Sequence, residues 1–306
     1  MEPVVVGCFD GEGAMRGILL AVIIREAGGL KGRFSSRTVV YGGPLVDEEH
    51  KRKEQIVEML LEELVAKVKR RSIFIQFRAL YEMSDYQHIF ERFGFQWQPR
   101  LNLLIDTVDE RKVRQGISPG RKRQIRKSLA NGAKVTEPEN AEQVMAFYEI
   151  LYDLYKLKVK KPLPHRTFFL SAYEASKQKE KTGMGVKFFL VTYEGKIVGG
   201  IMAPYFEGKA VYEWYVCGLD RQYKEKGIYP SVLATWAAID FAARNGFGIF
   251  DFMGVGLPGK PYGVRDFKRK FGGHQVNFGR YSRVNNRWFY AAAELGFNLL
   301  SWVRKI

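Results

Sequence analysis

The chain has 306 residues, 46% of them hydrophobic and 14% aromatic, which allows one large domain or two ordinary ones and excludes a disordered protein. Its net charge of +16 favours an anionic partner, such as RNA, an anionic membrane face or a phosphate-bearing substrate, without choosing among them. Two distant cysteines and four scattered histidines argue against a disulfide framework and a bound metal. Since the sequence shows no signal peptide and no membrane-spanning apolar run, we expect a cytoplasmic protein.

The first hundred residues predict strands in a hairpin-like series, followed by alternating helices and strands. An apolar run ends at Asp10-Gly11, a hairpin turn signal, and its partner strand follows. We expect strands at residues 4–9, 17–24, 38–41, 73–77 and 100–105, and helices at 53–68 and 86–93. This order is typical of an α+β or mixed α/β unit.

The most basic stretch spans residues 110–131. Ser118 and Pro119 are good first residues for a helix, and Gly132 is a good stop. Ile125 and Leu129 are predicted to form its apolar seam, which leaves the basic residues on the other sides. The helix is either a phosphate-binding or connecting element or a solvated linker. In the first case the tRNA or phosphate contacts are Arg121, Lys122, Arg126 and Lys127.

A new series of elements then begins. Helices are expected at residues 139–158, 165–181, 230–245 and 264–271, and strands at 186–193, 197–205, 210–217, 249–253 and 275–284. Tight turns at Glu194-Gly195 and Glu207-Gly208 make the first three strands an antiparallel meander. A final apolar helix, capped by Asn285 or Asn286, either packs on its own domain or lies in a membrane interface through residues 287–306.

Residues 250–273 combine features of a ligand site. Asp251 stands near the end of a buried strand, and a glycine-rich loop follows it. On the next helix Lys268 lies between Phe267 and Phe271, where its ammonium can meet negative charge at a reacting centre. The alternative for Lys268 is a solvated basic helix. For Asp251 it is a structural carboxylate that caps the loop.

The element order of the second half is that of the GNAT acyltransferase fold, a meander that leads into a splayed central pair of strands. The first half is a degraded version of the same order. We therefore predict an α/β (α+β) protein with two GNAT-like domains of mixed sheets flanked by helices. Residues 1–115 form the first domain, which lacks an opening strand and helix, and residues 116–306 form the second, which holds the active site.

Four segments resemble the FemABX family: YGGPLVD (41–47), QIRKSLANGAKV (124–135), IFDFMG (249–254) and GVRDFKRKFGG (263–273). These bacterial transferases add amino acids to peptidoglycan precursors from aminoacyl-tRNA. The resemblance covers nearly the whole length, and its FK-x-x-FG pattern is the most specific piece. It implies that Lys268, preceded by Phe267, stabilises the charge that develops during acyl transfer.

The resemblance also implies basic residues that hold substrate phosphates. The candidate near the GP element is Arg37, with Lys31 and Arg33 as alternatives. The candidates before the long helix of the second domain are Arg221, Lys224 and Lys226. The chain departs from the family pattern because it lacks the long coiled-coil arm of some members. Similar proteins also act in envelope polysaccharide pathways with other acyl donors.

The donor is judged from the loop before the helix at residues 230–245. CoA-dependent enzymes of this fold have Q/R-x-x-G-x-G/A there, whose N–H groups hold the pyrophosphate. This chain has KEKGIY, with Gly227 in place and bulky Tyr229 where a small residue is needed. This pattern argues for a donor other than CoA. Aminoacyl-tRNA fits the basic charge, and so does an anionic lipid-linked or nucleotide-linked precursor.

The expected reaction is transfer of an amino acid from aminoacyl-tRNA to the amine of lipid II or UDP-MurNAc-peptide, with no cofactor and no covalent intermediate. Asp251 and Glu213 are candidate bases, and Tyr215 is a candidate for positioning substrate. One alternative is an acyl-CoA-dependent N-acyltransferase of envelope polysaccharide or lipopolysaccharide synthesis. The other is a non-catalytic RNA- or membrane-surface-binding protein. Peripheral contact with the inner membrane face is expected through residues 287–306.

Overall fold

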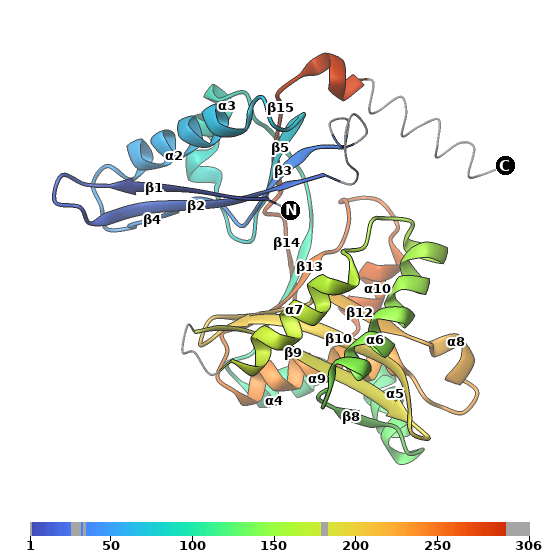
Figure 1. Cartoon of the computed structure of the whole chain (residues 1–306). Coiled ribbons are helices and arrows are strands. Elements are labelled where there is room, and N and C mark those ends of the chain that lie inside the picture. Colours follow the sequence, from blue (N-terminus) through green and yellow to red (C-terminus); the bar gives the residue numbers. More distant parts are fainter. Residues whose placement is uncertain (1, 26–31, 33–34, 179–182, 292–306) are drawn as a thin grey trace. The chain divides into compact units, whose positions relative to one another are not determined.

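The computed structural model describes residues 2–25, 32, 35–178 and 183–291. The chain forms two compact units, one of Met1–Arg100 with Asn277–Ile306 and the other of Leu101–Val276 (Figure 1). The chain thus passes from the first unit to the second and back again. Each unit is built on its own sheet.

Unit 1 has one mixed sheet with helices α2 and α3 packed against it. Its described strands are β1 (Glu2–Phe9), β2 (Met15–Ile24), β3 (Arg37–Tyr41), β4 (Leu45–Val46), β5 (Phe74–Arg78), β6 (Gln96–Gln98) and β15 (Arg280–Val284). Its described helices are α2 (Lys53–Val68), the 3-10 turn η1 (Ser84–Tyr86) and α3 (Gln87–Arg92). The strand order is β1-β2-β3-β5-β15-β6, with β4 beside β2, and β3 and β5 run parallel.

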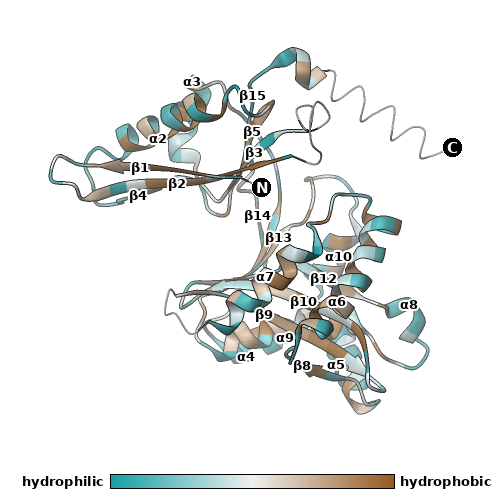
Figure 2. Ribbon diagram, viewed as in Figure 1, coloured by the Kyte–Doolittle hydropathy of each residue, from teal (hydrophilic) through white to brown (hydrophobic). Residues whose placement is uncertain are grey.

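Local chemistry explains the first hairpin. The Asp10 carboxylate accepts hydrogen bonds from the N–H groups of Glu12 and Ala14, at 3.0 and 2.9 Å, and so closes the turn between β1 and β2. The apolar face of α2 then buries Leu60, Leu61 and Leu64 on the sheet. Figure 2 shows apolar residues along this hairpin and polar ones at the short helix α8 (Asp220–Tyr223) of unit 2.

Unit 2 has a second mixed sheet. Its described strands are β7 (Asn102–Asp106), β8 (Lys134–Thr136), β9 (Met184–Tyr193), β10 (Lys196–Phe206), β11 (Ala210–Tyr212), β12 (Tyr215–Gly218), β13 (Ile249–Gly254) and β14 (His274–Val276). The remaining described helices are α4 (Glu110–Gly116), α5 (Pro119–Ala130), α6 (Ala141–Leu154), the π-helical turn η2 (Tyr155–Val159), α7 (Arg166–Lys177), α9 (Pro230–Arg244) and α10 (Gly263–Arg269). The strand order is β14-β7-β13-β11-β10-β9-β8, with β12 beside β10.

Helices cover both faces of this second sheet. Strand β10 directs Val198 and Ile201 into a core shared with α9, α5 and α4, and Met202 into a separate core shared with α6 and α7. Such a fully covered strand needs apolar residues on both sides, which explains its continuous apolar sequence. None of the helices in the described ranges has an apolar stretch long enough to cross a bilayer.

Most predicted elements are present, and two predicted strands are divided. Residues 275–284 form β14 and β15, which belong to different sheets. Gly279, with φ +74 and the Trp97 ring against its Cα, lies in the loop between them and allows the chain to change units. Residues 210–217 form β11 and β12, which separate at Glu213 and Trp214.

The division into units differs from the predicted boundary between residues 115 and 116. Strand β7 pairs with β13 in the second sheet, whereas β15 pairs with β5 and β6 in the first. Sequence order alone places β7 in the first domain and β15 in the second. Asn286 caps the final helix, since its Oδ1 accepts the Phe289 N–H at 3.0 Å. The rest of the predicted interfacial helix, residues 292–306, lies outside the described residues, as do Lys31 and Arg33.

Candidate active site

The candidate site lies where two neighbouring strands of unit 2 separate. Strand β11 runs parallel to β13 only from Ala210 to Tyr212. The Glu213 N–H then donates to the Asp251 carbonyl oxygen at 2.9 Å, and the Trp214 N–H turns to the Met202 carbonyl oxygen at 3.3 Å. From Tyr215 the chain continues as β12, which pairs with β10. The predicted splayed pair is therefore present.

The side chain of Lys268 reaches this point from α10. Its Nζ lies 2.8 Å from Glu213 Oε1 and donates to the Phe252 carbonyl oxygen at 2.6 Å. Lys268 is 7% exposed and Glu213 5%, so this is a buried ion pair and not a solvated basic helix. Glu213 Oε2 accepts the Thr235 hydroxyl of α9 at 3.4 Å. Since an ammonium has three N–H donors, these two contacts leave Lys268 one donor for a ligand.

Asp251 is buried beside this pair, on β13. Its Oδ1 accepts the Met253 N–H at 2.6 Å, and its Oδ2 accepts the Asn102 side-chain amide at 3.5 Å. Burial raises the pKa of Asp251 to about 6, although both hydrogen bonds and the Lys268 charge act in the opposite direction. Met253 has φ +59, a costly conformation for a side-chain-bearing residue. The hydrogen bond from the Met253 N–H is the arrangement expected if Asp251 is a structural carboxylate that caps the loop, the alternative to a catalytic role.

Arg121, on α5, packs against α10 and the residues that follow it. Its guanidinium lies over the rings of Phe267 and Phe271, at 4.2 and 5.1 Å from their centroids, and its Nη2 donates to the Phe267 carbonyl oxygen at 3.2 Å. Arg121 is 7% exposed and burial lowers its pKa. This placement corrects the predicted seam of α5, whose buried residues are Arg121, Ile125 and Ser128, whereas Leu129 is exposed.

An aromatic cluster follows the strand separation. Tyr215 contacts the rings of Tyr155, Phe168 and Phe169, and Phe168 stacks on Trp214, with ring centroids 6.2 Å apart. Tyr155 begins η2, and π-helical turns are frequent at functional sites. The predicted residue Tyr215 thus belongs to an apolar wall beside the candidate site.

The loop before α9 is held by α5 and by the half-buried Asp220. Asp220 accepts hydrogen bonds from the N–H and the hydroxyl of Ser231, in the first turn of α9. Burial raises the pKa of Asp220, and its bonds to Ser231 act against the rise. The Tyr229 N–H donates to Ser128 Oγ at 3.0 Å. At Gly227, φ +74, a Cβ would lie 2.4 Å from Lys127 Cε. These contacts occupy the loop that holds CoA phosphates in related folds.

The remaining predicted residues are more dispersed. Arg221 and Lys224 are exposed near the start of α9, and the exposed Lys226 lies 3.6 Å from Glu194. On α5, Arg126 and Lys127 are exposed, and Lys122 is half-buried with its Nζ donating to the Gln115 carbonyl oxygen. Arg37 begins β3 and so belongs to unit 1.

Sequence reasoning missed Asn102 and Thr235, the hydrogen-bond partners of the two buried acids. Each is a lone polar residue in an apolar run, LNLLI and VLATWAAI respectively. That pattern signals a buried polar contact but does not name the partner, which for Asn102 is 149 residues away. The role of Arg121 under α10 was missed for the same reason.

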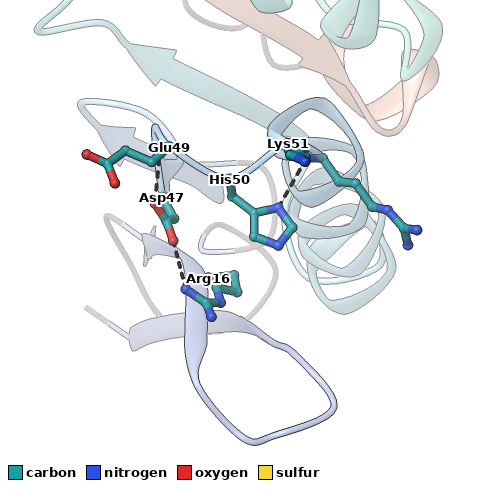
Figure 3. Close-up of a pocket in the computed structure, with 6 residues that line it drawn as sticks. Arg16, Asp47, Glu49, His50 and Lys51 are labelled. Atoms are coloured by element: carbon teal, nitrogen blue, oxygen red, sulfur yellow. Dashed lines mark hydrogen bonds and ion pairs between the residues drawn. The ribbon is translucent and has the colours of Figure 1, made fainter.

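The linings of two surface hollows do not include Lys268. In unit 1, a hollow of about 480 Å³ is lined by Arg16, Asp47, Glu49, His50, Lys51 and Arg52 (Figure 3). Arg16 pairs with Asp47 at 2.9 Å, and the His50 ring accepts the Arg52 N–H, so these polar groups satisfy one another. In unit 2, a hollow of about 370 Å³ at the start of α5 is lined by Ser118, Gly120, Arg121, Arg123, Gln124 and Lys270.

Comparison with known proteins agrees with this geometry. Residues 119–269 match the family model described as acetyltransferase (GNAT) domain. The matched segment lies within unit 2 and includes the strand separation, Glu213, Asp251 and Lys268. No curated protein matches the sequence significantly.

Solved structures extend the likeness beyond the GNAT domain. FemX matches with a TM-score of 0.68 and 13% identity, over 95% of this chain and 90% of FemX. A second match is the C-terminal domain of a protein assigned as a lysylphosphatidylglycerol synthetase from Agrobacterium fabrum. Its TM-score is 0.58 and its identity 12%, over 97% of this chain and 89% of that one. A tandem GNAT protein from the clavulanic acid biosynthesis pathway matches with a TM-score of 0.54 and 10% identity, over 93% of this chain and 84% of that one. The predicted tandem GNAT architecture and the FemABX resemblance are therefore confirmed as a shared fold.

Single and double replacements of Lys268 and Glu213 distinguish a chemical role of the ion pair from its contribution to protein stability. We expect Lys268→Met and Glu213→Gln each to lower the free energy of unfolding by about 3–5 kcal/mol, because each leaves one buried partner without its counter-charge. The double variant should recover most of that loss in urea denaturation, yet lack transfer activity. A double variant that is stable and fully active would contradict a chemical role for Lys268.

The buried acid predicts a pH dependence of stability. The pKa of Asp251 rises from its ordinary 3.8 to about 6, so between these values the folded protein keeps a proton that the unfolded chain has lost. Stability should therefore fall as pH rises through this window, by up to about 3 kcal/mol relative to Asp251→Asn. Denaturant titrations of both proteins from pH 4 to 7 measure the difference, and parallel curves would contradict it. Retained transfer activity in Asp251→Asn would assign the carboxylate a structural role.

Proposed function

We propose that this protein is an aminoacyltransferase, which transfers an amino acid from aminoacyl-tRNA to the amine of a peptidoglycan precursor, lipid II or UDP-MurNAc-peptide. The observation that carries the proposal is the Lys268 ammonium, buried at the strand separation of a GNAT domain with one donor left for a ligand. A preorganised cation in a site of low dielectric stabilises charge that develops on a reacting carbonyl oxygen.

The reaction needs little covalent chemistry from the protein. The acceptor amine attacks the ester carbonyl, a C–N bond forms, and the carbonyl oxygen becomes an oxyanion. Lys268 donates its remaining N–H to that oxygen. The C–O bond to the tRNA ribose then breaks, and the proton of the amine ends on the departing hydroxyl. Glu213 pairs with Lys268 and orients it, and Tyr215 belongs to the wall that positions the substrate.

The start of α9 supports a donor other than CoA. In CoA-dependent GNAT enzymes the N–H groups at this helix start hold the pyrophosphate. In this chain the Asp220 carboxylate accepts the Ser231 N–H there, and Ser128 accepts the Tyr229 N–H. An acid at this position repels phosphate, so a bound CoA would have to displace it.

Charge supports the proposed partners. A net charge of +16 favours tRNA and an anionic precursor, and Lys122, Arg126 and Lys127 of α5 together with Arg37, Arg221, Lys224 and Lys226 are the proposed phosphate contacts. We place the protein in the cytoplasm, with peripheral contact to the inner membrane face through residues 287–306. The fold shared with a lysylphosphatidylglycerol synthetase supports a substrate at a lipid surface.

The second candidate is an acyl-CoA-dependent N-acyltransferase of envelope polysaccharide synthesis. It is favoured by the description of the matching family as an acetyltransferase domain. The contacts of Asp220 and Ser128 with the N–H groups at the start of α9 argue against this alternative.

The first test is a transfer assay with purified protein, charged tRNA or acyl-CoA as donor, and lipid II or UDP-MurNAc-pentapeptide as acceptor. We expect label in the precursor only with charged tRNA, and a loss of at least a hundredfold in Lys268→Met, comparable to the loss of one oxyanion donor. Lys209→Met, which removes an exposed lysine of a hairpin turn in the same unit, is the matched control and should keep full activity. Transfer from acyl-CoA alone, or from neither donor, would refute the proposal.

CoA binding is tested separately by thermal unfolding. We expect acetyl-CoA to leave the melting temperature unchanged, even at a concentration about a hundred times a micromolar dissociation constant. A ligand that bound at this excess would raise the free energy of unfolding by about 2.7 kcal/mol. An increase of several degrees would favour the CoA-dependent alternative.

A further inference from the structure

The connection between α6 and α7 presents basic and apolar side chains on the surface of unit 2. We call residues 156–161, KLKVKK, the basic turn. Leu157 is 68% exposed and Val159 36%, and no residue of η2, which contains both, is buried. Between Asp153 and Glu174 the sequence has no acidic residue and five basic ones: Lys156, Lys158, Lys160, Lys161 and Arg166.

The backbone keeps these apolar side chains out of the core. Leu154 packs on the core shared by α6 and α7, and a continued α-helix would hold Leu157, three residues later, near the same face. The chain instead forms a π-helical turn, in which the Lys160 N–H donates to the Tyr155 carbonyl oxygen at 2.7 Å. Lys160 has φ +52, a left-handed conformation that is costly for a lysine. The fold thus maintains a strained turn that exposes apolar residues between lysines.

The charges of this connection are available to a partner. Within the described part of the chain, none of the five basic residues forms an ion pair. Lys156 Nζ lies 5.9 Å from the ring centroid of the exposed Tyr152, one turn earlier on α6. Lysines, a tyrosine ring and exposed aliphatic side chains occur together where proteins meet the boundary between lipid headgroups and acyl chains.

This combination fits a lipid bilayer better than RNA or a protein. RNA phosphates can pair with the lysines, but they leave Leu157 and Val159 in water. Protein interfaces are depleted in lysine and enriched in arginine, whereas four of the five basic residues here are lysines. An anionic bilayer satisfies both kinds of side chain, because its headgroups attract lysine and its acyl boundary takes up leucine and valine.

The basic turn adjoins the candidate active site. Tyr155, which precedes it in η2, contacts the Tyr215 ring, with centroids 6.2 Å apart. Tyr215 belongs to the apolar wall beside the strand separation. Contact of the basic turn with a bilayer therefore brings that wall to the membrane surface.

We propose that the basic turn binds the surface of an anionic lipid bilayer, with Leu157 and Val159 in the acyl boundary and the lysines among the headgroups. This surface belongs to unit 2 and is distinct from residues 287–306. The binding does not depend on the proposed function, because it follows from exposed charge and apolar area. A second statement, that the acceptor is the lipid-linked precursor, rests on the proposed function.

Sedimentation of the full chain with vesicles of phosphatidylcholine, with or without phosphatidylglycerol, tests the surface. We expect binding only when phosphatidylglycerol is present, and weaker binding at high salt. The affinity should fall about tenfold in Leu157→Ser and about fivefold in Lys158→Gln. Val108→Ser and Lys134→Gln are the matched controls, since they change exposed residues elsewhere in unit 2, and they should bind as the wild type does. All four variants should melt at the wild-type temperature.

Absence of binding to the anionic vesicles, or equal binding to both kinds of vesicle, would overturn the proposal. Wild-type binding by Leu157→Ser, or an equal loss in Val108→Ser, would also overturn it. A short RNA that binds through Lys158, without any vesicle binding, would replace the bilayer by RNA. A protein that binds vesicles through the basic turn but transfers no amino acid would retain this surface and refute the proposed function.

The acceptor is tested with the same variant. We expect Leu157→Ser to lower transfer to lipid II in vesicles more than transfer to UDP-MurNAc-pentapeptide in solution. An equal effect on the two acceptors would overturn the lipid-linked assignment.

Discussion

The buried ion pair of Lys268 with Glu213 depends on the separation of two strands, and much of unit 2 serves to hold that pair. A lysine and a glutamate are stable in a core only when each has the other and further hydrogen-bond partners. The Phe252 carbonyl and the Thr235 hydroxyl supply them here. Arg121 fixes α10 from the opposite side through the rings of its two phenylalanines. The position of one buried ammonium thus depends on α5, α9, α10 and β13.

The sequence predicts what depends on local chemistry. The Ser118 cap of α5, the turns at Gly195 and Gly208, and the basic helix that carries Lys268 follow from residues a few positions apart. The partners of the buried acids could not be predicted, because sheet register and helix packing bring them together across the chain. The break at Glu213 was hidden for a related reason, since one charged residue in an otherwise apolar run does not show that the two ends of the run pair with different strands.

The start of α9 has backbone N–H groups that are bound by side chains of the same protein. The N-terminus of a helix attracts anions, and the GNAT fold offers one beside its strand separation. In this chain that end is occupied from within by Asp220, while Ser128 of α5 takes the Tyr229 N–H. The same backbone that serves a cofactor in other members of the fold is used here to anchor the basic helix α5 to the domain core.

The position of β15 affects how the chain folds during synthesis. β15 lies between β5 and β6, so the unit 1 sheet is complete only after residue 284 has left the ribosome. All strands of unit 2 precede β15 in the sequence. Domains usually fold in order from the N-terminus, but this connectivity allows the inner unit to close first. Until then β5 and β6 lack the strand that pairs with both of them, so one edge of the nascent unit 1 sheet is unpaired and open to association with other chains.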